Sequence, residues 1–95
     1  MTYNDSSLWN EENEIRSLII MKRLQDEGFP RGRQMELCRE MSRITGLDPA
    51  NISAKVGNYK SLAGINKSSH ASVNSKDIYE RYGRLTIDAL EAMVR

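Results

Sequence analysis

The sequence has few of the residues from which metal centres, disulfides and covalent catalysis are built. Its 95 residues include one cysteine, Cys38, and one histidine, His70. A single cysteine forms no internal disulfide, and no group of Cys and His has the spacing of zinc ligands. No nucleophile stands at a recognisable spacing from His70, and the chain contains neither a glycine-rich phosphate loop nor a nuclease motif. We therefore expect no enzymatic activity, no metal and no cofactor.

Long hydrophobic runs are also missing. No apolar stretch approaches the roughly 18 residues that a membrane span requires. The first residues, "MTYNDSSLW", lack the basic and apolar regions of a signal peptide. With 39% apolar and 28% charged residues, the composition is that of a folded globular chain. We expect a single cytoplasmic domain over residues 1–95, without a membrane or a small-molecule substrate as partner.

The formal net charge of +1 hides an uneven distribution along the chain. Residues 1–30 contain six acidic and three basic residues, residues 31–70 contain three acidic and seven basic, and residues 71–95 contain four of each. Lys and Arg bind phosphates with release of counterions, so the basic central block favours a polyanionic partner. A solvated face of mixed charge has the same composition, and charge alone leaves both interpretations open.

Hydrophobic periodicity predicts an all-α bundle of four to five helices, with weak strand signals throughout. The first helix covers residues 10–27, with Asn10 as its cap and Gly28 and Pro30 beyond its end. Its apolar stripe comprises Ile15, Leu18 and Ile19 with Lys22, widened by Met21 and Leu24. After a polar loop over residues 65–75, a fourth helix starts near Asn74 or Ser75 and Gly83 interrupts it. The last stretch has Ile87, Leu90 and Val94 at helical spacing, and we expect the natural protein to continue beyond it.

Two helices joined by a short turn occupy the centre of the sequence. The first covers residues 33–44 with an apolar face made of Leu37, Cys38, Met41 and Ile44, so Cys38 is expected in the core. The second runs from Pro49 to about Leu62, with Asp48 as its cap. Helix, glycine-containing turn and helix is the outline of a helix-turn-helix over about residues 33–62. A helical hairpin of similar length has the same outline.

The helix that begins at Pro49 has two different faces. At 100° per residue, one side gathers Ile52, Val56, Tyr59 and Ala63. The opposite side carries Ala50, Asn51, Ala54, Gly57, Asn58 and Ser61, with Lys55 and Lys60 flanking it. A helix in the DNA major groove needs a narrow surface, polar groups for base edges and cations for phosphates. A helix surface without a partner tolerates the same residues, but surface positions usually favour better helix formers than Gly and Asn.

This pattern predicts which residues would contact the bases and which the phosphates of double-stranded DNA. Base contacts are assigned to Asn51 and Asn58, and a contact with a thymine methyl to Ala50 or Ala54. The remaining candidate DNA-binding residues are Lys55 and Lys60 at the margins, Ser61 on the same face, Arg31 and Arg33 near the start of the preceding helix, and Lys67 in the polar loop. Outside this group, Trp9 either staples the start of the first helix to the core or contacts a partner. Tyr79 and Tyr82 are expected as core or dimer-contact residues.

Three segments together resemble a known family. "LWNEE", "REMSRITGLDPANISAKVGNYKSL" and "SKDIYERY" follow one another within about residues 8–82. In this order they resemble a DNA-binding domain at the N-termini of phage and mobile-element proteins. That family includes replication initiators of phage satellites and phage-encoded nucleases, homing or origin-targeting, that act at the same origin repeats. The resemblance implies binding to a short repeated sequence in an origin, with Asn51, Lys55, Asn58 and Lys60 on the recognition helix. It also implies a catalytic or ATPase domain further along a longer protein.

The leading hypothesis is a sequence-specific DNA-binding domain of a replication initiator, dimeric through its apolar terminal helix. The same domain would serve equally as the DNA-targeting module of a phage nuclease or as a transcriptional repressor. A hypothesis of another class is a small helical protein-interaction module or inhibitor, using Trp9, Met21, Leu24 and the terminal helix. This second hypothesis predicts an exposed apolar patch.

Overall fold

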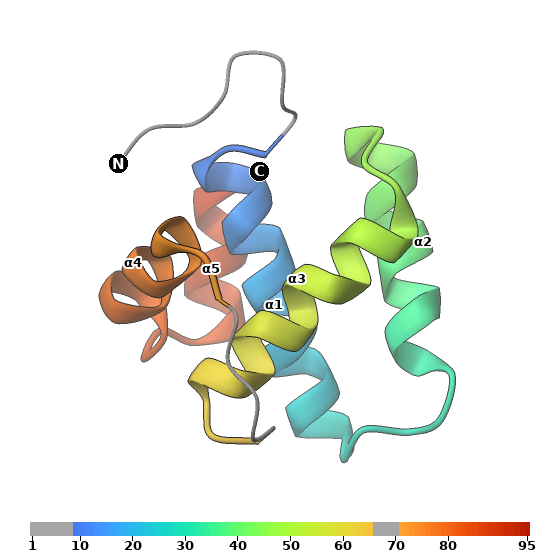
Figure 1. The fold of residues 1–95 in the computed structure, drawn as a ribbon, viewed down its shortest axis with the longest axis horizontal. Helices are drawn as coiled ribbons and strands as arrows, with labels where there is room; N and C mark the ends of the chain where they lie inside the picture. Colours follow the sequence, from blue (N-terminus) through green and yellow to red (C-terminus); the bar gives the residue numbers. More distant parts are fainter. Residues whose placement is uncertain (1–8, 66–70) are drawn as a thin grey trace.

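The structure of the chain is a computed structural model that describes residues 9–65 and 71–95, and every regular element in these ranges is a helix (Figure 1). The helices are α1 (Glu11–Glu27), α2 (Arg33–Thr45), α3 (Pro49–Leu62), α4 (Val73–Tyr82) and α5 (Ile87–Met93). The predicted all-α class is therefore confirmed. The predicted bounds of the first three helices agree with the observed ones to within one residue.

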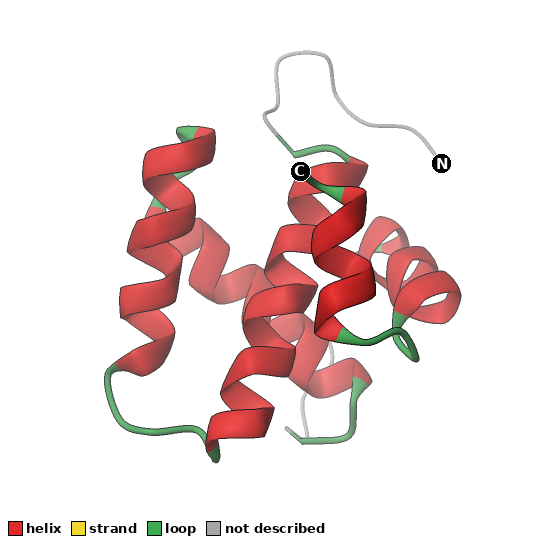
Figure 2. Ribbon diagram, turned by 180° about the vertical axis from the view of Figure 1, so that it is seen from behind, coloured by secondary structure: helices red, strands yellow, loops and turns green. Residues whose placement is uncertain are grey.

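The helix α1 is the centre of the fold, because it packs against each of the other four helices. Figures 1 and 2 show α3 on one side of α1 and α5 on the opposite side. The buried residues of α1 are Asn13, Glu14, Ile15, Ser17, Leu18, Ile19, Ile20, Met21 and Leu24. The predicted single stripe was too narrow, because a helix with neighbours on several sides buries more than one face.

The ends of the first three helices follow the capping residues in the sequence. The Asn10 side chain accepts a hydrogen bond from the Asn13 N–H at 2.8 Å, as its predicted role as a cap requires. Gly28 follows α1 in the left-handed conformation at φ 79°. Asp48 precedes α3 as predicted, and its carbonyl accepts from the Ile52 N–H at 3.0 Å. The Asp48 carboxylate makes no capping hydrogen bond, so α3 begins with the preset backbone angle of Pro49 rather than with a side-chain cap.

The later helices and one apolar face differ in detail from the predictions. The cap of α4 is Ser72, so the helix begins at Val73, one or two residues before the predicted start, and it ends at Tyr82, directly before the predicted interruption at Gly83. Ile44 was placed on the buried face of the second helix, but it is 72% exposed. The interior holds Leu37, Cys38 and Met41 from α2, and no described element covers the last turn where Ile44 lies. The prediction for Ile44 is therefore wrong.

Two glycine substitutions are expected to change stability in opposite directions. Gly28→Ala forces a β-carbon into a left-handed backbone conformation and should lower the free energy of unfolding by about 1–2 kcal/mol. Gly57 lies within α3, and a β-carbon there would meet nothing within 4 Å. Gly57→Ala should therefore raise the free energy of unfolding by about 0.5–1 kcal/mol. Urea unfolding of the two variants beside the wild type measures both changes, and shifts of the same sign would contradict the assigned backbone conformations.

Candidate nucleic-acid interface

The helix α3 turns its apolar side to the core and its polar side to solvent. Ile52, Val56 and Tyr59 are each 0% exposed, as predicted. The outer face of α3 consists of Ala50, Asn51, Ala54, Gly57, Asn58 and Ser61; its first three residues are exposed and its last three are half-buried. The predicted buried face is thus confirmed, and the predicted outer face is exposed over its amino-terminal half. The amino-terminal half of the outer face is the more open part.

The structure places Lys55 away from this outer face. Its ammonium lies 3.0 Å from a carboxylate oxygen of Glu14, and its side chain is only 14% exposed. The same nitrogen donates to the Ser75 hydroxyl at 3.2 Å and stands 4.8 Å from the centroid of the Trp9 ring. The predicted position of Lys55 at the margin of the outer face is therefore wrong, and its ion pair weakens its candidacy for a DNA phosphate. At 100° per residue Lys55 is 60° from Ile52, which is close enough to the buried face for a long side chain to reach an acid inside.

The acid that Lys55 meets, Glu14 on α1, is buried among partners from two other helices. Glu14 is 1% exposed, and one of its carboxylate oxygens accepts hydrogen bonds from the Tyr59 hydroxyl at 2.6 Å and from the Ser75 hydroxyl at 3.0 Å. We call Glu14, Lys55, Tyr59 and Ser75 the Glu14 cluster. It joins α1, α3 and α4 and sets where α3 lies on the core. Glu14 stands among the acids of the first turn of α1, where a carboxylate usually matches the helix dipole, but its position four residues before Leu18 places it on the buried stripe.

Lys60 lies at the opposite margin of α3, beside α2. Its ammonium donates to the side-chain oxygen of Gln34 and stands 5.2 Å from the centroid of the Phe29 ring. Gln34 also donates to the Ser53 hydroxyl at 2.8 Å, so it ties α2 to α3. Lys60 forms no ion pair within the described part of the chain and is half-buried. Its predicted place at the margin of the outer face is retained.

The other predicted cations differ in their exposure and in their ion pairs. Arg31 is exposed in the loop before α2. Arg33 pairs with Glu27 at 3.0 Å and with Glu36 at 3.1 Å, and the hydrogen bond that its guanidinium donates to Glu27 is the main reason that its pKa lies above the ordinary value. Arg33 is thus engaged by two carboxylates, which weakens its candidacy for a phosphate. Lys67 and His70 lie outside the described residues.

The remaining predicted residues occupy structural positions. The Ser61 hydroxyl donates to the Gly57 carbonyl of its own helix at 3.2 Å. Cys38 is 0% exposed, as predicted for a core residue, and burial raises the pKa of its thiol. Trp9 and Tyr79 pack partly buried against the core, as does Tyr82, whose hydroxyl donates to Glu11 at 2.7 Å. Residues 9–65 and 71–95 contain no group of three or more His, Cys, Asp or Glu that could hold a metal ion.

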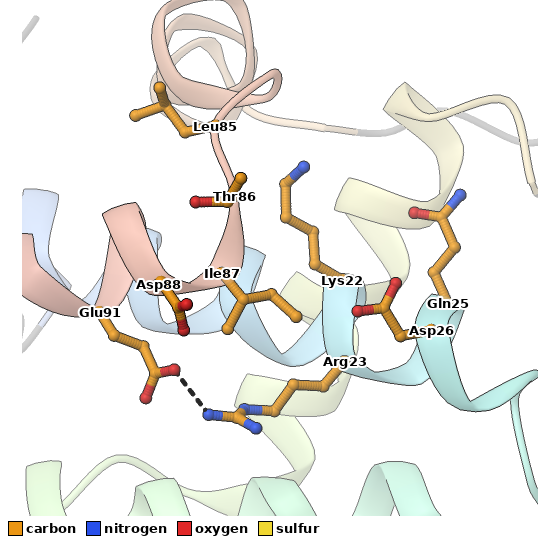
Figure 3. A pocket seen from close by; sticks show the side chains of 9 residues that line it. All are labelled: Lys22, Arg23, Gln25, Asp26, Leu85, Thr86, Ile87, Asp88 and Glu91. Atoms are coloured by element: carbon orange, nitrogen blue, oxygen red, sulfur yellow. Dashed lines mark ion pairs between the residues drawn. The ribbon is translucent and has the colours of Figure 1, made fainter.

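A polar pocket of about 540 Å³ lies on the side of α1 away from α3, between the second half of α1 and the start of α5 (Figure 3). It is lined by Lys22, Arg23, Gln25, Asp26, Leu85, Thr86, Ile87, Asp88 and Glu91. Arg23 and Glu91 form an ion pair across it at 2.9 Å. Because charges of both signs face each other here, the pocket offers no concentrated potential for an ionic ligand.

A second hollow, of about 340 Å³, is mainly apolar, and we call it the Ile44 groove. It runs between α1, α2 and the end of the chain, with Ile44 on its rim. Its other lining residues are Arg16, Ile19, Ile20, Arg23, Leu37, Met41, Glu91, Val94 and Arg95. Met21 and Leu24, which the protein-interaction hypothesis placed on an exposed patch, are 2% and 1% exposed. That part of the hypothesis is wrong, and the Ile44 groove takes the place of the predicted patch.

Comparison of the chain with protein-family models, with curated proteins and with solved structures finds no match in any of the three. The fold and the site define a class: a small protein whose described residues form only helices, with a polar face at the start of α3 open to solvent. No helix within the described residues is long and apolar enough to cross a membrane.

Proposed function

We propose that this chain is a double-stranded DNA-binding domain of the helix-turn-helix type, with α2 and α3 as its two helices and α3 as the recognition helix. The observation that carries the proposal is the outer face of α3. Asn51 and Ala54 are exposed there on a helix whose opposite side is fixed by the fully buried Ile52 and Tyr59. A rigidly held helix with small and amide side chains outward fits the major groove, where Asn pairs with adenine.

The setting in which this domain works is part of the same proposal. The resemblance to initiators and nucleases of phages and their satellites favours repeats in a replication origin as the target. A dimer through α5 stays a prediction, and the fold sets its geometry. Because α3 and α5 lie on opposite sides of α1, such a dimer would turn its two recognition helices away from each other (Figures 1 and 2). Its two half-sites would then lie on separate stretches of DNA.

The experiment that tests the proposed function is selection of bound fragments from a random pool of double-stranded DNA at low and moderate salt. We expect a recovered sequence motif, and an affinity that falls as salt rises because phosphate contacts release counterions. Circular dichroism of the same sample establishes that the protein is folded. Recovery of no motif by the folded protein would overturn the proposal.

One observation favours a second candidate function, a protein-interaction module. The Ile44 groove exposes an isoleucine beside further apolar side chains, which is the kind of surface that binds another protein. This groove and the outer face of α3 are separate surfaces, so the two functions are compatible. Loss of DNA selection with the fold retained would leave the groove as the remaining functional surface.

A further inference from the structure

Lys55, which the sequence placed at one margin of the outer face of α3, forms an ion pair inside the protein. Lys55 is held by Glu14, and four other described cations form ion pairs with carboxylates, namely Arg16, Arg23, Arg33 and Arg81. The major groove is bounded by two phosphate backbones, so a recognition helix needs cations beside it. Another exposed cation without an ion pair must therefore lie near the outer face if α3 enters the groove.

The helix α2 supplies Arg39 and Arg43, which are both exposed and form no ion pair within the described residues, and Arg39 is the nearer of the two to the side where α2 meets α3. Gln34 marks that side through its contacts with Ser53 and Lys60. We measure angles around α2 from Gln34 at 100° per residue. The buried Cys38 then lies at about 40°, Ser42 at about 80°, Met35 at about 100° and Arg39 at about 140°. Arg39 is exposed and forms no ion pair with any residue that the structure describes.

We propose that Arg39 holds a phosphate of the DNA strand that runs alongside α2, in the role that the sequence gave to Lys55. The inference rests on the proposed function. Under this proposal Arg39 and Lys60 supply one cation from each helix of the pair. A guanidinium on the exposed side of α2 has the length and the donor fork to reach a backbone oxygen while α3 lies in the groove. Contacts of this kind fix the register of the protein on the duplex and carry no sequence information.

The test is the salt dependence of binding to the duplex recovered by selection. Arg39→Gln should reduce the magnitude of the slope of log K against log salt by about 0.9, the value for one phosphate contact. At 0.1 M salt this corresponds to about eightfold weaker binding. The loss should be equal for the selected duplex and for a scrambled one, because a phosphate contact is independent of sequence. Arg39→Lys retains the charge and should keep most of the slope.

Arg84→Gln is the matched control, because Arg84 is an exposed arginine in the turn between α4 and α5 and forms no ion pair with a described residue. It changes the net charge by the same amount, and its slope should equal that of the wild type. Equal slopes for Arg39→Gln and the wild type, or equal reductions in the Arg39 and Arg84 variants, would overturn the assignment while the proposed function stands. Failure of the wild type to bind any duplex would overturn both.

Discussion

Replacing Glu14 with alanine is expected to lower the free energy of unfolding by about 3–5 kcal/mol. The Lys55 ammonium pairs with Glu14 at 3.0 Å, and the Lys55 side chain is only 14% exposed. The substitution therefore leaves this charge without its counter-charge. It also removes the acceptor of the Tyr59 and Ser75 hydroxyls. A buried charge or donor without a partner keeps its full desolvation cost. The loss is a large share of the roughly 5–15 kcal/mol that holds a small domain folded, and urea unfolding measures it.

A double-mutant cycle measures the coupling free energy between Glu14 and Lys55. Glu14→Gln keeps an oxygen that accepts from the Tyr59 and Ser75 hydroxyls but leaves the Lys55 charge without a counter-charge. Lys55→Met leaves the Glu14 carboxylate without one. The double variant removes both charges and should recover most of the stability, since a buried ion pair and an uncharged replacement of similar volume are often equivalent. Glu91→Gln is the control, because the Arg23–Glu91 pair is more than a third exposed on both sides and should contribute at most about 1 kcal/mol. Additive losses in the cycle would contradict a coupled buried pair.

Ala54→Glu is expected to weaken DNA binding by about 100-fold or more. Ala54 is exposed near the middle of the outer face of α3, so under the proposed function the new carboxylate enters the major groove between two phosphate backbones. Like charges brought together at an interface cost several kcal/mol. Glutamate is a good helix former, so the free energy of unfolding should stay within about 0.5 kcal/mol of the wild type. Fluorescence anisotropy with a duplex recovered by selection gives the affinity.

The control for this substitution is Ala92→Glu. Ala92 is an exposed alanine on α5, on the side of α1 opposite to α3 (Figure 2). It receives the same charge and should bind DNA within a few-fold of the wild type. Equal weakening in both variants would assign the effect to net charge, and wild-type affinity of the Ala54 variant would exclude the outer face of α3 from the DNA interface.

The sequence by itself determined the local elements of this protein. Asn10 and Gly28 bound α1 and Pro49 opens α3, because the Asn10 side chain accepts a backbone hydrogen bond and because Gly28 and Pro49 adopt backbone angles that end or start a helix. The spacing of Ile52, Val56 and Tyr59 fixed which side of α3 is buried, since three large apolar side chains on one face leave only one favourable orientation. The outer face of α3 followed from the same spacing.

Only the tertiary structure decided which charges are free and which apolar residues are covered. Lys55 looked like a surface cation because its partner, Glu14, is 41 positions earlier in the sequence, and no periodicity relates two helices that meet at an angle. Ile44 has the spacing of a core residue, yet α1 and α3 cover α2 only as far as Met41 on that side. Pairing and coverage depend on how whole helices pack together. That packing is the sum of many distant contacts, which no local pattern along the chain contains.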